Sequence, residues 1–140
     1  GGMAGSSLFR YMAEAGMNPV LVNADRGSSW RNIGGGRTAF SLPELAEIAA
    51  RNHELFKELQ HISNIDYKPI RYISFAHDEA TYKALEASKA WSKAEMIAPM
   101  QFREEISPYF NVHPKKYISA LVSEDCWQAT PGKVVDLIRN

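Results

Sequence analysis

The sequence predicts an α/β fold in which helices flank a parallel sheet. Three features near the N-terminus support this prediction. A glycine-rich start runs straight into a helical pattern, Gly16 ends that pattern, and an apolar run of strand length follows over residues 19–23. A helix, a glycine stop and a strand in this order form the second half of a βαβ unit, whose two strands are parallel. We expect the first strand of that unit to precede Gly1.

The first helix is predicted over residues 3–15, because its apolar residues recur at three- and four-residue spacing. We expect these residues to form one buried stripe: Met3, Ala4, Leu8, Tyr11, Met12 and Ala15. Residues 24–40 are rich in Gly and Ser, which predicts a long loop with no helix or strand of its own. Loops of this length are more often functional than idle.

A second helix is predicted from Ser41, since serine is a favoured N-cap. Its apolar spacing continues to about His61. The alternating residues 70–75 then predict a strand, and Asp78 opens a third helix that reaches about Trp91.

The remaining elements are shorter. The pattern predicts an extended piece at residues 96–98, a single short helix at 101–106 and a strand at 117–122. The last helix is predicted to begin at Thr130-Pro131.

Composition excludes several classes of protein. The chain of 140 residues is long enough for one domain with a real core, and its 16 basic residues balance 16 acidic ones. A nucleic-acid partner therefore has no electrostatic support, and no apolar run is long enough to span a bilayer. The single cysteine, Cys126, excludes an internal disulfide and suits a reducing compartment, so we expect a cytoplasmic protein. Cys126 is expected to be a buried or turn thiol, and the scattered histidines predict no metal site.

The first residues match the last five positions of a GxGxxG motif. In the complete motif the glycines allow a tight turn and let backbone N–H groups approach a pyrophosphate at the helix N-terminus. Gly2, Met3 and Gly5 are therefore candidate phosphate-binding residues. Ser6 and Ser7 either join them or simply add polarity to the helix N-terminus. A Gly-Gly start has a second interpretation, because a cleaved expression tag leaves the same residues.

Several later motifs follow in a specific order. A strand ends in Asn23, a Ser-x-x-Asn-x-Gly-Gly loop spans Ser29–Gly36, and a long helix contains Leu45-Ala46 through Leu59. With the glycine-rich start, they resemble the FAD-binding region of the D-amino-acid oxidase and glycine oxidase-like family of FAD-dependent oxidoreductases. Residues 101–108 resemble the family's Glu-rich helix before a proline, and residues 123–131 resemble its Asp-Gly-x-x-Asp-Pro turn.

The resemblance implies a partial Rossmann-like FAD-binding domain. Its Rossmann-like part would span residues 1–65, and additional helices and strands would span residues 66–140. FAD is the implied cofactor, with phosphates at the start of the first helix, ribose at the end of the strand and flavin along the glycine-rich loop. The implied cofactor-binding residues are Gly2, Met3, Gly5, Ser6, Asn23, Asp25, Arg26, Ser28, Ser29, Arg31, Asn32, Gly34, Gly35 and Gly36.

Two of these positions leave alternatives open. The family usually has Glu where this chain has Asn23, and an amide lacks the charge-assisted strength of a carboxylate. Asp25 is the substitute if the strand end bends. Arg31 either neutralises cofactor charge or is solvated, and Trp30 either covers the cofactor or packs against the core.

The implied function is that of an FAD-binding segment of a flavin-dependent oxidoreductase, which transfers a hydride from amino acids or related amines to the flavin. The family's substrate-binding groups lie mainly outside this segment, so we name no catalytic residue and do not expect the chain alone to be active. The alternative is a non-catalytic fragment or subunit, stabilised by a companion chain or a second copy that covers unpaired sheet edges. A third interpretation is an unrelated small α/β protein with a Gly-Gly tag.

Overall fold

The computed structural model describes residues 1–24, 27–106, 108 and 116–140, and the chain divides into two compact units. The first unit comprises Gly1–Gly35, Glu54–Lys68 and Gln128–Asn140. The second unit comprises Gly36–His53 and Pro69–Trp127.

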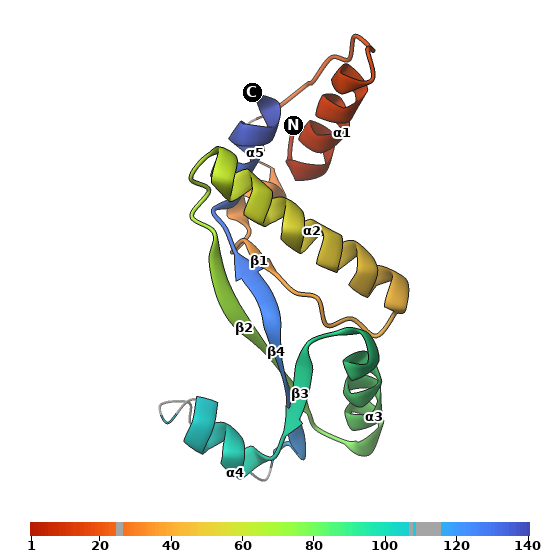
Figure 1. Ribbon diagram of the computed structural model, residues 1–140, viewed down its shortest axis with the longest axis vertical. Coiled ribbons are helices and arrows are strands. Elements are labelled where there is room, and N and C mark those ends of the chain that lie inside the picture. Colours follow the sequence, from red (N-terminus) through yellow and green to blue (C-terminus); the bar gives the residue numbers. More distant parts are fainter. Residues whose placement is uncertain (25–26, 107, 109–115) are drawn as a thin grey trace. The chain divides into compact units, whose positions relative to one another are not determined.

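The order of elements matches most of the helices predicted above. Figure 1 labels helices and strands with the following bounds: α1 (Met3–Glu14), η1 (Ser28–Arg31), β1 (Gly35–Gly36), α2 (Pro43–Ile62), β2 (Lys68–Ala76), α3 (Glu79–Ser88), η2 (Lys89–Trp91), β3 (Ala94–Ile97), α4 (Pro99–Gln101), η3 (Phe102–Ile106), β4 (Ser119–Gln128) and α5 (Pro131–Arg139). Local signals begin and end them as expected. Asp78 caps α3 by accepting a hydrogen bond from the Thr81 N–H at 2.8 Å, and Gly16 follows α1 with a φ of +80°.

The strands form one sheet in the order β1-β4-β2, and β3 also pairs with β4. Strands β3 and β4 are antiparallel, with Ala94 opposite Ser123 and Ile97 opposite Ala120. The structure therefore confirms the α/β class with flanking helices, but it does not confirm a parallel sheet. The parallel arrangement was inferred from residues 19–23, and the strands that pair in the structure lie later in the chain.

The strand predicted over residues 19–23 is wrong, because the structure assigns no strand to this segment. Val20 and Val22 are 87% and 84% exposed. The Gly1 amino group donates a hydrogen bond to the Val22 carbonyl oxygen at 3.1 Å. A strand needs a ladder of such bonds with a neighbouring strand, and the described residues supply no such neighbour here.

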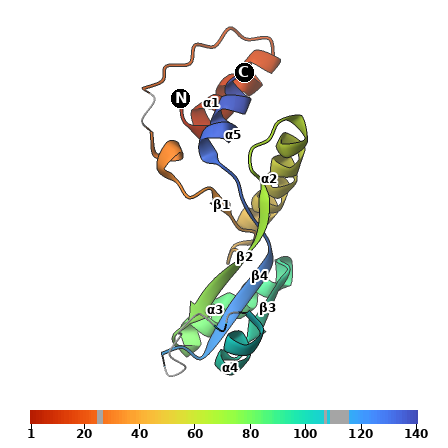
Figure 2. The same ribbon diagram turned by 90° about the vertical axis from the view of Figure 1, so that its left-hand side faces the viewer.

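The core of the first unit has Ile65, Ala129 and Val134 at its buried centre. Helix α1 packs against α5 in this unit (Figure 2). The predicted buried stripe of α1 is largely wrong, since Leu8 and Tyr11 are 61% and 62% exposed. Helical spacing identifies an apolar face, but only a neighbouring element can bury it, and the described residues leave this face uncovered.

A turn at Asp66 is tied to the start of α5 within the first unit. Asp66 has a φ of +58°, and its carboxylate accepts hydrogen bonds from the Lys133 ammonium at 2.8 Å and the Thr130 hydroxyl at 2.6 Å. The bond from Lys133, followed by that from Thr130, holds the pKa of the Asp66 carboxyl below its ordinary value of 3.8.

We expect this turn to contribute to the acid sensitivity of the protein. Because folding lowers the pKa of Asp66, its stabilising effect is present above the unfolded pKa and is lost as the pH falls through the folded pKa. The Asp66→Asn variant should therefore lose less thermal stability than wild type between about pH 5 and pH 2. Asparagine also tolerates the positive φ. Melting temperatures measured across this range test the prediction, with the exposed Asp136→Asn as control; identical wild-type and Asp66→Asn curves would contradict it.

The core of the second unit lies where η3 meets the sheet. Ile97, Phe102, Ala120 and Val122 form its buried centre, and Ile73 and Phe75 pack against it. The Phe75 and Phe102 rings meet edge to face, with centroids 5.3 Å apart.

Strand β4 runs to Gln128, so the turn that the resemblance implied for residues 123–131 is wrong for its first six residues. Cross-strand contacts hold this segment extended: Ser123 lies opposite Ala94, and the Thr38 hydroxyl donates to the Asp125 carbonyl oxygen at 3.0 Å. Cys126 is fully buried in β4, and burial raises the pKa of its thiol. The expectation of a buried thiol is confirmed.

Candidate functional site

The N-terminus of α1 gathers several of the predicted cofactor-binding residues within the first unit. Gly2 is the N-cap and has extended backbone angles, with φ −78° and ψ −171°. The Met3 N–H donates to the Ser29 hydroxyl oxygen at 3.1 Å. The first turn of α1 contains no acidic residue. The first N–H groups of a helix lack helical acceptors, so this end of α1 is suited to an anion.

Glycine at positions 1 and 2 makes this arrangement possible. A Cβ on Gly1 would overlap the Asn23 side chain, and a Cβ on Gly2 would lie 2.8 Å from the Ser29 hydroxyl oxygen. The two glycines therefore let Asn23 and Ser29 approach the helix end closely. This close backbone approach is what the glycines of a dinucleotide motif provide, and in that respect the residues present fit FAD.

Ser6 and Gly5 take different positions on α1. Ser6 is fully buried, and its hydroxyl donates to the Gly1 carbonyl oxygen at 3.1 Å. This hydrogen bond holds Gly1 against the first turn of α1. The Ser7 hydroxyl donates to the Met3 carbonyl oxygen at 2.9 Å. Gly5 is exposed, and a Cβ there would meet nothing within 4 Å.

The glycine-rich loop is fixed by its own contacts and by the stretch before α5. The Asn32 side-chain oxygen accepts from the Gly34 N–H at 2.7 Å. The Gly34 carbonyl oxygen accepts from the Ala129 N–H at 3.0 Å, and the Gln128 amide donates to the Ile33 carbonyl oxygen at 3.1 Å. Asn32 and Gly34 therefore shape this loop.

Four other predicted residues lie in η1 and β1. Ser28 and Arg31 are exposed in η1, and Gly35 is exposed at the start of β1. Gly36 belongs to the second unit. Asp25 and Arg26 lie outside the described residues. Arg37, the other arginine near the loop, stacks over Phe40 with its guanidinium 4.7 Å from the ring centroid.

The sequence analysis did not predict the contact between Trp30 of this loop and Gly132 of α5. A Cβ on Gly132, the second residue of α5, would lie 2.5 Å from Cζ3 of Trp30. Trp30 therefore packs against α5, which favours packing over cofactor cover among the two alternatives above. No local pattern links Trp30 to a glycine about a hundred residues later, so the sequence alone offered no signal.

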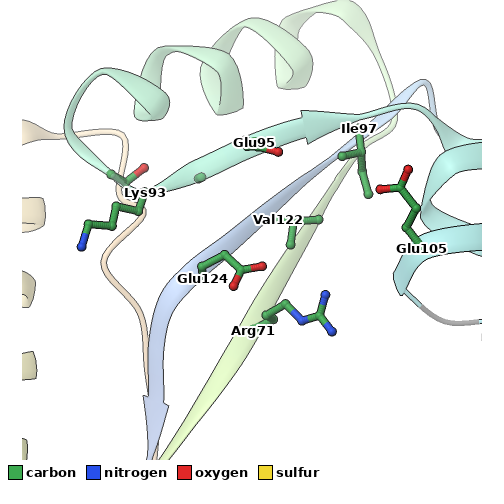
Figure 3. A pocket seen from close by; sticks show the side chains of 9 residues that line it. Arg71, Lys93, Glu95, Ile97, Glu105, Val122 and Glu124 are labelled. Atoms are coloured by element: carbon green, nitrogen blue, oxygen red, sulfur yellow. The ribbon is translucent and has the colours of Figure 1, made fainter.

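A hollow of about 600 Å³ lies in the second unit. Figure 3 shows Arg71 and Glu124 on the neighbouring strands β2 and β4, with Glu105 of η3 across from them. Ile97 and Val122 contribute apolar surface to the lining. The sequence analysis assigned no site role to these residues, and the hollow is open and of mixed charge.

In the described part of the chain, no group of three or more metal-ligating side chains gathers. None of the helices described is both long enough and apolar enough to cross a membrane.

An α/β fold whose first helix begins directly after glycines is typical of dinucleotide-binding proteins. The family model described as DAO, FAD dependent oxidoreductase, matches residues 1–140. The chain belongs to this family of FAD-dependent oxidoreductases. The predicted family and its cofactor, FAD, are thereby confirmed. A search of curated proteins finds no match.

Two solved structures are similar to this chain. An L-proline dehydrogenase from P. horikoshii superposes with a TM-score of 0.76 at 19% identity, covering 99% of this chain and 38% of that chain. A glycine oxidase from Bacillus cereus ATCC 14579 gives a TM-score of 0.67 at 18% identity, covering 99% of this chain and 42% of that chain. These likenesses show the fold, and this chain spans about two fifths of the length of either structure.

Proposed function

We propose that this chain is the FAD-binding segment of a flavin-dependent oxidoreductase that acts on amino acids or related amines. The observation that carries the proposal is the N-terminus of α1, where the Met3 N–H and the Ser29 hydroxyl meet beside Asn23. Phosphates bind at such helix ends because unpaired N–H groups and the helix dipole both favour negative charge.

The names of the two similar structures support the proposed substrate class. One is a proline dehydrogenase and the other a glycine oxidase, so each is named for an amino acid. When bound, FAD supplies the acceptor for a hydride from the α-carbon of such a substrate. The role proposed for this chain is to bind and orient the cofactor, with the α1 N-terminus at the pyrophosphate, Asn23 at the ribose and the glycine-rich loop beside the flavin. We assign no catalytic residue to it.

A second candidate function is that of a partner-stabilised structural module. Large apolar side chains are exposed on α1 and on the segment that follows it: Leu8, Tyr11, Met17, Val20 and Val22. Exposed apolar side chains of this size are candidate contacts for another chain. A companion chain or a second copy is therefore the proposed partner.

An FAD titration distinguishes these candidates. Flavin fluorescence is followed as the chain is added, first alone and then with any co-purifying partner. Saturable quenching by the chain alone supports a self-sufficient cofactor site, and quenching only with the partner supports a split enzyme. An absence of binding in both cases favours the structural module.

The Ser29→Ala variant should bind FAD about tenfold more weakly than wild type, because a hydrogen bond to a charged group contributes about 1.5 kcal/mol. The Ser29 oxygen accepts from Met3 and still has a proton to donate to a phosphate oxygen. Fluorescence titration measures the two dissociation constants. The matched control is Ser63→Ala, an exposed serine of the same unit. Equal affinities of wild type and Ser29→Ala would remove the phosphate site from this helix end.

A further inference from the structure

The side chain of Trp30 lies directly on the backbone of α5. A Cβ on Gly132 would lie 2.5 Å from Cζ3 and 2.8 Å from Cε3 of Trp30, both in the six-membered ring. Carbon atoms in contact are normally about 3.5–4.0 Å apart, so only glycine leaves room for the indole at this position. Trp30 and Gly132 both belong to the first unit.

Two hydrogen bonds also join the glycine-rich loop to the residues just before α5. The Ala129 N–H donates to the Gly34 carbonyl oxygen at 3.0 Å, and the Gln128 side chain donates to the Ile33 carbonyl oxygen at 3.1 Å. The stretch that leads into α5 thus determines where the loop lies.

Ser29 of this loop contacts the first residue of α1. Ser29 directly precedes Trp30, and its hydroxyl oxygen accepts from the Met3 N–H at 3.1 Å. Gly2, the N-cap, has no side chain that caps the helix, so Ser29 supplies this cap from another part of the chain. A hydroxyl that accepts from the helix can donate its own proton to an anion bound there.

We propose that Gly132 is a positioning residue for the FAD phosphate site: by admitting the Trp30 ring against α5, it sets the Ser29 hydroxyl at the N-terminus of α1. This inference rests on the proposed function and deepens it. It makes α5, the last helix of the chain, part of the support for a site that the first residues form.

The test compares FAD dissociation constants of four proteins with that of wild type. Gly132→Ala displaces the indole and should weaken binding about tenfold, as the loss of the Ser29 hydroxyl does. Combining Gly132→Ala with Ser29→Ala should weaken binding no more than Ser29→Ala alone, because the effect passes through that hydroxyl. The matched control is Gly27→Ala: Gly27 precedes η1 and is not one of the predicted cofactor-binding residues, and a Cβ there meets nothing within 4 Å. This control should bind FAD as wild type does.

A second substitution that restores FAD binding tests the inference even if Gly132→Ala also lowers the stability of the protein. Trp30→Phe removes part of the ring that the new Cβ would strike, so Gly132→Ala with Trp30→Phe should bind FAD more tightly than Gly132→Ala alone. Unchanged binding by Gly132→Ala, additive effects with Ser29→Ala, or no rescue would each overturn the inference while leaving the proposed function intact. If wild type binds FAD neither alone nor with a co-purifying partner, the proposed function fails, and the inference fails with it.

Discussion

Replacing Gly34 by alanine should lower the free energy of unfolding by about 3 kcal/mol, one of the two largest effects we expect in this protein. Gly34 has a φ of +74°, a conformation that costs an alanine roughly 1–2 kcal/mol. Its Cβ would also overlap the Ala129 carbonyl oxygen, a backbone atom that has no rotamer to change. Relieving that overlap would displace the hydrogen bond from the Ala129 N–H to Gly34, and crowding of this kind costs roughly 1–3 kcal/mol.

Gly16 provides the matched control for Gly34. It has a φ of +80°, but a Cβ there would meet nothing within 4 Å. Gly16→Ala should therefore cost only the conformational part, roughly 1–2 kcal/mol. Urea unfolding of both variants, followed by circular dichroism, measures the difference. Equal losses would mean that the contact with Ala129 contributes nothing.

Replacing Phe102 by alanine should cost about 3–5 kcal/mol, the range measured for large buried aromatic residues. The Phe102 side chain is 1% exposed and packs with Ile97, Ala120 and Val122 against the sheet. Alanine would also remove the edge-to-face contact with Phe75 and leave a cavity in the centre of the second unit.

Two further variants calibrate this loss. Met100→Ala, on a side chain that is 60% exposed, should change stability by less than about 0.5 kcal/mol. Phe102→Leu keeps most of the apolar volume and should cost less than about 1.5 kcal/mol. Urea unfolding gives the three values, and amide hydrogen exchange should accelerate in β3 and β4 of the Phe102→Ala protein. A loss for Phe102→Ala no greater than that of Met100→Ala would show that this core contributes little.

The helices could be predicted because their signals are local. Asp78 caps α3 through an N–H three residues away, and Gly16 follows α1 in the left-handed conformation. The strands were harder to predict, because a strand depends on a partner far away in the sequence. Residues 19–23 have strand composition but no partner among the described residues, whereas β4 continues past Val122 because neighbouring strands hold it.

The candidate site shows the same division. The glycines at positions 1 and 2 and the strand-end position of Asn23 were predicted from the motif, and the structure brings Gly1, Gly2 and Asn23 together. Ser29 was predicted as part of a loop motif, without its role as acceptor for the Met3 N–H. The contact between Trp30 and Gly132 was not predicted, since it joins two residues that no local pattern connects.

The sequence by itself determined the helices, the glycine-framed start of α1 and the family to which the chain belongs. Each depends on residues near one another in the chain or on the order of motifs along it. Only the tertiary structure decided which strands pair, which apolar faces are buried and how α5 supports the loop that carries Ser29. These features depend on contacts between distant residues, and burial and strand pairing exist only once the chain has brought such residues together.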